Sequence, residues 1–163
     1  MAKKLSANID YFEGYQLLGL ASQLKDYSLA FFINQKLDID LKKYENLDFC
    51  DSEGQSHSFS WYFYEDEQLS AKMYLISNTS TTAKLIPANK ELDYFLLLKD
   101  FPSEKSANLI LSKSREIQNI QAIFKFDLNK IKNADILIEN IELHEIKCTV
   151  RSKNTTKKNI TFL

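Results

Sequence analysis

The residues best suited to covalent chemistry are two cysteines and two histidines, and Cys50 and His57 lie close in the sequence. A thiol beside an imidazole can act as a nucleophile, so a Cys50–His57 dyad is one hypothesis. The alternative is a loop cysteine without a reactive role. The chain has no GxSxG motif, and its isolated glycines form no phosphate-binding loop. Spacing alone therefore identifies no nucleophile.

Carboxylates are grouped at two places where they could bind a cation. Glu65–Asp66–Glu67 is an acidic run at a predicted turn, and Asp38 and Asp40 share one face of a predicted strand. Adjacent turn residues do not converge on one ion, so the alternatives are a solvated hairpin tip and a solvated strand edge. The histidines and cysteines lack zinc-ligand spacing. We expect no metal site and no cofactor.

A set of aromatic side chains on a predicted hairpin is the main candidate for function. The set that alternates away from the predicted core forms the candidate interaction surface, which consists of Tyr62, Tyr64, Lys72 and Tyr74. Tyrosines beside a lysine can stack RNA bases. They can equally be buried by a partner protein, or be covered by another segment of the same chain. The sequence leaves these three interpretations open.

Basic residues gather at the C-terminus, and no acidic residue stands among them. The basic tail consists of Lys147, Arg151, Lys153, Lys157 and Lys158. It is either a solvated tail or an arm for RNA or an acidic partner. We expect residues 1–138 to form a single α+β domain and residues 139–163 to form a basic C-terminal extension.

Apolar patterns predict the elements that position these residues. The run Gln16–Ala21 is typical of a buried strand, and a helix follows Ser22. Leu92–Lys99 is almost wholly apolar, which indicates a central strand covered on both faces. A second helix begins at Pro102–Ser103. Further strands are predicted at Asp38–Leu41, His57–Tyr64, Gln68–Ile76, Thr81–Ile86 and Ile120–Phe126, with a loop at Tyr44–Gln55 and a helical turn capped by Asp127.

The two most regular strands also predict their own register. A hairpin loop with an odd number of residues, three or five, keeps the apolar side chains of both strands on one face. The three-residue loop Glu65–Asp66–Glu67 pairs Phe63 with Leu69. It also pairs Trp61 with Ala71. The overall order is βαβ, hairpin strands, then βαβ. This order predicts an α+β fold, a mostly antiparallel sheet with two helices packed on one face, in an elaborated ferredoxin-like arrangement.

The stretch LIPANKELDYFL resembles the signature of the IPExxxVDY family of small bacterial proteins. Ile86 and Pro87 stand at its start and Asp93 and Tyr94 at its end, while Ala88 and Leu92 replace the family's Glu and Val. The resemblance extends from about Gly14 to Ile138. It implies no known activity and no catalytic or ligand-binding residue. The motif itself is expected to form a strand end, a turn and the start of the central strand, with Asp93 capping the turn or pairing with a base.

Composition limits the possible functions further. The 163 residues form one domain by length, and their net charge of −1 disfavours a dedicated nucleic-acid binder. No signal peptide or membrane span is expected, and the distant cysteines fit a reducing compartment, so we expect a cytoplasmic protein. We predict a non-enzymatic protein-interaction or regulatory module. Its partner would be a second copy of the chain, in a homo-oligomer, or another protein. The alternatives are an RNA-associated protein that uses the tyrosines and the basic tail, and a small carboxylate-dependent enzyme.

Overall fold

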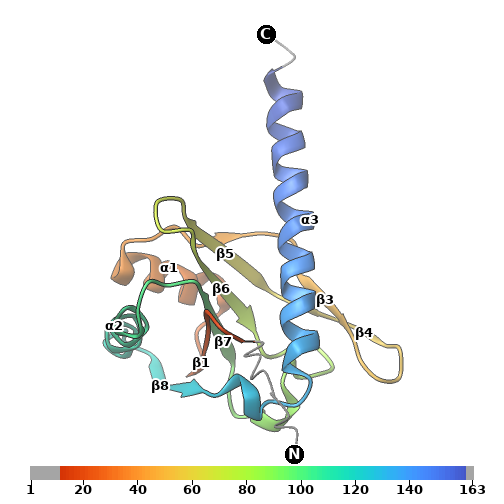
Figure 1. Cartoon of the computed structure of the whole chain (residues 1–163). Helices are drawn as coiled ribbons and strands as arrows, with labels where there is room; N and C mark the ends of the chain where they lie inside the picture. The colour runs from red at the N-terminus through yellow and green to blue at the C-terminus, as the bar shows by residue number, and fades with distance from the viewer. Residues whose placement is uncertain (1–11, 161–163) are drawn as a thin grey trace, which may run out of the picture.

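The computed structural model describes the backbone of residues 12–160 and the side chains of residues 12–151. An antiparallel sheet forms its centre, and helices lie on both sides of that sheet (Figure 1). The strands are β1 (Tyr15–Ser22), β2 (Lys42–Lys43), β3 (Leu47–Cys50), β4 (Ser56–Phe59), β5 (Trp61–Asp66), β6 (Ala71–Ser77), β7 (Tyr94–Lys99) and β8 (Ile120–Phe126). The helices are α1 (Asp26–Leu37), α2 (Glu104–Arg115) and α3 (Ala134–Ile160), with short 3₁₀ turns η1 (Pro87–Asn89) and η2 (Leu128–Lys130).

The sheet has the strand order β2-β5-β6-β7-β1-β8, and every neighbouring pair is antiparallel. Leu96 on β7 lies opposite Leu18 on β1 and opposite Leu75 on β6, so β7 is an inner strand as its apolar sequence predicts. Strands β3 and β4 pair with each other in a separate small sheet. The α+β fold with a mostly antiparallel sheet is therefore confirmed.

Two apolar clusters lie on opposite faces of the sheet. On one face, Leu18 and Leu96 pack with Leu29 and Ile33 of α1 and with Ile110 of α2. On the other face, the cluster contains Trp61, Tyr74 and Phe95 together with Ile138 and Ile141 of α3. The prediction of two helices on one face is correct for α1 and α2, but α3 covers the opposite face and makes the molecule three-layered (Figure 1).

The predicted hairpin register is wrong. Phe63 pairs with Tyr74 rather than Leu69, and Trp61 pairs with Ile76 rather than Ala71. The physical reason is that β6 is buried on both faces, so its alternating residues do not mark one core face. Residues 67–70 form a four-residue connection in which Ser70 adopts a left-handed backbone with φ 54°.

Other expected strands also differ from the structure. Asp38 is the left-handed C-cap of α1, with φ 55°, so no strand covers Asp38–Leu41. Thr81–Ile86 forms a turn region with an isolated bridge between Thr79 and Lys84, followed by η1. The loop expected at Tyr44–Gln55 contains β3. By contrast, Asp127 caps η2 as expected, because its side chain accepts a hydrogen bond from the Asn129 amide.

Helix α3 crosses the boundary that the sequence suggested between the domain and its extension. It runs without a break from Ala134 to Ile160. Ile141 and Cys148 lie beyond residue 138 and are buried against the sheet. In Figure 1 the C-terminal part of the helix projects past the sheet. The segment expected as an extension thus begins as part of the packed body.

Candidate interaction surface

The candidate surface predicted on the hairpin is divided between the two faces of the sheet. Tyr62 and Tyr64 belong to the face covered by α1 and α2, whereas Tyr74 belongs to the face covered by α3. Lys72 also faces α3, because its ammonium group contacts Glu145. Tyr62 and Tyr74 are buried. The register difference causes this division, since pairing Phe63 with Tyr74 moves the even-numbered residues of β6 to the face of Trp61.

Lys72 and Tyr74 instead hold α3 to the sheet through Glu145. The Tyr74 hydroxyl donates to Glu145 at 3.0 Å, and the Lys72 ammonium lies 2.9 Å from the same carboxylate. Burial, followed by the charge of Glu145, raises the pKa of Tyr74 well above its usual range. The Tyr74 hydroxyl therefore stays neutral and acts as a donor within the helix–sheet interface.

A second group of this kind lies nearby, around Glu142. Tyr15 donates its hydroxyl hydrogen to the Glu142 carboxylate, and Lys99 lies 3.2 Å from it. The hydrogen bond from Tyr15 lowers the pKa of Glu142 despite the opposing effect of burial, and Lys99 contributes in the same direction. The carboxylates of Glu142 and Glu145 are thus both occupied by partners from the sheet. The two groups fasten a helix, and their geometry presents no reacting pair.

The hypothesis of a Cys50–His57 dyad finds no support in the contacts of His57. Its Nε2 lies 2.8 Å from Asp51, and its Nδ1 lies 2.9 Å from the Thr82 hydroxyl. Both ring nitrogens are therefore occupied without Cys50. The contact with Thr82 ties the β3–β4 hairpin to the turn near Thr79. Asp, His and Thr are residue types of a catalytic triad, but none of the four pockets described in the structure is lined by them.

The structure brings together a cysteine and a histidine that sequence reasoning missed. His144 and Cys148 stand four residues apart on α3, and Cys148 Sγ lies 3.4 Å from His144 Nε2. The same nitrogen lies 2.7 Å from the Glu45 carbonyl oxygen, so it donates there and cannot accept the thiol proton. Burial, with the charge of Glu45, raises the pKa of Cys148. This thiol is therefore a packing group, and its helical spacing was the only signal in the sequence.

The residues of the family-like motif have structural contacts. Ile86 is buried, and Pro87 begins η1. The Asp93 carboxylate accepts a hydrogen bond from the Ser22 amide at 2.8 Å. The Tyr94 hydroxyl donates to the Leu24 carbonyl at 2.6 Å. The two side chains therefore tie the start of β7 to the end of β1.

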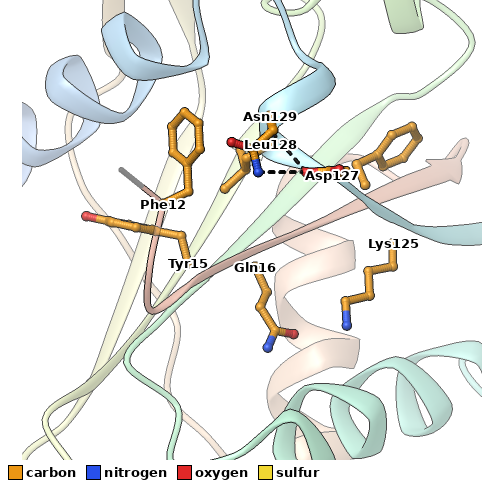
Figure 2. A pocket seen from close by; sticks show the side chains of 8 residues that line it. Phe12, Tyr15, Gln16, Lys125, Asp127, Leu128 and Asn129 are labelled. Carbon is orange, nitrogen blue, oxygen red and sulfur yellow. Dashed lines mark hydrogen bonds between the residues drawn. The ribbon is translucent and has the colours of Figure 1, made fainter. Parts of the chain in front are cut away.

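The largest of the four described pockets lies beside the start of β1 and the end of β8 and has a volume of about 420 Å³. Figure 2 shows that its lining side chains point in different directions, with Tyr15 turned away from Gln16 and Lys125. The two charges at the pocket already have partners, because Lys125 contacts Glu104 and Asp127 accepts from Asn129. The buried Gln16 Oε1 has no hydrogen-bond partner among the described residues. The pocket gathers no acid–base pair.

The outward side of α3 exposes a row of apolar side chains. Its apolar side chains are 46–56% exposed and are here named the outer stripe, which consists of Ile136, Leu143, Ile146 and Val150. The buried side of the same helix carries Ala134, Leu137, Ile138, Ile141 and Cys148. At 3.6 residues per turn, the two sets lie on opposite sides of the helix. Helix α3 is therefore apolar on two faces, and the sheet covers one of them.

The basic tail follows the outer stripe along the same helix. Lys147 is exposed, and Arg151 forms an ion pair with Glu45 on the loop before β3. The side chains of Lys153, Lys157 and Lys158 lie outside the described side chains, although their backbone is helical. Residues 147–158 thus belong to a continuous helix rather than to a separate arm.

Comparisons with protein-family models and with curated proteins found no match to this chain. The IPExxxVDY resemblance therefore remains a prediction. Within the described residues, no helix has both the length and the apolar content needed to cross a membrane. The same part of the chain contains no group of three or more His, Cys, Asp or Glu side chains placed to hold a metal ion.

Proposed function

We propose that this chain is a non-enzymatic protein-interaction module that binds a partner helix through the outer stripe of α3. The two-faced apolar character of α3 is the observation that carries this proposal. An apolar face of a helix is normally covered, whereas the sheet covers only one of the two apolar faces here. Exposed apolar patches of this kind mark sites of protein association.

The spacing of the outer stripe supports a helix as the partner. Ile136, Leu143 and Val150 recur every seven residues, and Ile146 follows Leu143 by three. Apolar residues that alternate at three and four positions form the seam along which two helices pack. A strand or an irregular segment would not match this repeat over four helical turns. The outer stripe is therefore shaped for helix–helix contact.

The carboxylate-dependent enzyme receives no support from the geometry. Asp38 caps α1, Asp40 pairs with Lys42 on the surface, and the Asp93 carboxylate binds the Ser22 amide. None of the pockets described above is lined by any of the three. Catalysis by acid and base requires such groups to converge on one substrate.

The RNA-associated alternative keeps only part of its basis. The buried Tyr62 and Tyr74 cannot stack bases, but the basic half of α3 remains. Binding through that half would weaken steeply with salt, because it would depend on phosphate neutralisation. Association through the outer stripe would persist in salt, since apolar burial is not screened. We place the protein in the cytoplasm, where its two unpaired thiols would remain reduced.

A capture experiment with matched variants tests the proposed function. The tagged full-length chain is used as bait in native lysate, beside Leu143→Glu and the control Leu109→Glu. Leu109 lies on α2 and is 56% exposed, close to the 51% of Leu143. We expect Leu109→Glu to retain a protein, which can be another copy of the chain, and Leu143→Glu to lose it. Equal recovery with both variants would contradict the proposal, and salt-sensitive recovery of RNA would favour the alternative.

A further inference from the structure

We infer that the partner helix is α3 of a second copy of this chain, packed antiparallel along the outer stripe. This inference rests on the proposed function and names the occupant of the same surface. The observations that carry it are the charge distribution along α3, the positions of apolar residues in the outer stripe, and the placement of the sheet on the opposite side of the helix.

The charges of α3 favour an antiparallel second copy. In the first half of the helix Asp135 and Glu139 are exposed, whereas Glu142 and Glu145 bind the sheet, and no basic residue is present. The second half carries the basic tail and no acidic residue. An antiparallel copy places each acidic half beside a basic half. A parallel copy would place like charges together and would be disfavoured. The chain therefore provides its own complementary partner.

One register gives apolar partners to Ile136, Leu143 and Val150 and also pairs opposite charges, while Ile146 lies beside Asn140 of the second copy. With Leu143 on the two-fold axis, Leu143 meets its own copy and Ile136 meets Val150 of the second chain. The same register sets Glu139 opposite Lys147, and both side chains are exposed on the outer side of the helix. Shifting by one turn, so that Leu143 meets Ile146, would place Glu139 against Val150. A self-complementary patch of this type is the requirement for a two-fold dimer.

The shape of the molecule leaves room for this arrangement. The sheet lies on the buried side of α3, so the outer stripe faces directly away from it. The second copy would bring its own α3 against the first, with its sheet on the far side. The nearest flanking contacts, from Glu45 to His144 and Arg151, lie to the side of the helix rather than on the outer stripe. The dimer would thus join two intact three-layer bodies through two central helices.

Light scattering of the full-length chain over a dilution series tests the stoichiometry. We expect the unmodified chain and Leu109→Glu to be dimers, and Leu143→Glu to be a monomer at every concentration. Leu143→Glu places two carboxylates on the two-fold axis without touching the packed interior, so circular dichroism should show a native fold. A monomeric unmodified chain would overturn the inference, as would a Leu143→Glu dimer.

Disulfide trapping tests the direction of the helices. In a Cys50→Ser background, which removes the exposed thiol, the two variants Ile136→Cys and Val150→Cys are oxidised separately and as a mixture. An antiparallel dimer gives a mixed product only when both variants are present. Homodimeric products from each variant alone would show a parallel pair and overturn the inference. Absence of any product would overturn the register.

Charge reversal adds a test of the pairing between Glu139 and Lys147. Glu139→Lys should weaken dimerisation on the order of tenfold, and adding Lys147→Glu should restore it. If adding Lys147→Glu does not restore dimerisation, the register is contradicted.

The outcomes of these experiments also separate the further inference from the proposed function. If the chain is a monomer and the Leu143→Glu bait fails to capture a different protein that the control bait captures, the second copy is excluded but the interaction module stands. If the Leu143→Glu bait captures everything that the control bait captures, both proposals are contradicted.

Discussion

Asn78 is a buried polar residue whose contacts explain how the family-like motif is held. Its side-chain amide donates to the carbonyls of Leu92 at 2.8 Å and of Asn89 at 3.1 Å. Its side-chain oxygen accepts from the Ile86 amide at 2.8 Å. One residue at the end of β6 therefore satisfies three backbone groups of the turn that leads into β7. Buried backbone groups require such partners, because an unpaired one costs free energy.

Replacing Asn78 with alanine should therefore be strongly destabilising. We expect Asn78→Ala to lower the free energy of unfolding by about 3 kcal/mol, since three buried backbone groups lose their partner at once. The matched control is Asn140→Ala, whose side chain donates to the exposed Ile136 carbonyl. The control should change stability by less than about 0.5 kcal/mol. Denaturant unfolding measures both, and equal midpoints would refute the role of Asn78.

At the scale of elements, the sequence predicts most reliably where one pattern dominates. The apolar run of β7 and the Ser103 start of α2 are correct, because burial on both faces and helix initiation leave clear signals. The register of β6 against β5 is not determined by the pattern, because apolar residues lie on both faces of β6 and fit an odd or an even loop equally. The sequence pattern over residues 134–160 does not predict helix α3. Apolar residues on its two opposite faces obscure both the helical and the strand period. The two apolar faces that obscure the helix in the sequence are also the observation on which the proposed interaction rests.

The docking of α3 onto the sheet depends on buried polar contacts as well as apolar ones. Glu145 is 8% exposed and bonds both Tyr74 and Lys72. We expect Glu145→Ala to lower the free energy of unfolding by about 3 kcal/mol, because it leaves a buried hydroxyl and a half-buried ammonium unpaired. Thermal or denaturant unfolding of the Leu143→Glu chain provides the measurement, since that background separates docking from association.

The control for this prediction lies on the outer side of the same helix. Glu139 is exposed, so Glu139→Ala in the same background should change the free energy of unfolding by less than about 0.5 kcal/mol. Equal losses for the two variants would mean that the contacts of Glu145 with the sheet do not determine the effect. A loss confined to Glu145 would show that the polar contacts fasten α3 to the sheet.

On the scale of the whole molecule, the three-layer arrangement buries tyrosines on both faces of the sheet. Burial is the main cause that raises the pKa of Tyr15, Tyr62, Tyr74 and Tyr94. For Tyr94 the raised pKa is about 12, and Asp26 and Asp93 contribute to it. The ordinary tyrosine pKa is about 10, so the folded state keeps these hydroxyls neutral when the unfolded chain would ionise them. Because helices cover both sides of the sheet, the free energy of unfolding depends on pH in the alkaline range.

The direction of this coupling follows from the raised pKa values. Below about pH 10 both states hold these protons, so the stability is fully present. As pH rises above that value, the unfolded chain releases protons that the folded chain keeps, and stability falls. We therefore expect the buried tyrosines to ionise only as the chain unfolds. Tyrosinate absorbance and far-ultraviolet circular dichroism, followed in one alkaline titration, measure the two events together. Tyr27→Phe, which removes an exposed tyrosine, should leave the pH of that cooperative step unchanged. Complete ionisation of the tyrosines while the circular dichroism stays native would show that the sheet faces are open, contrary to the three-layer fold.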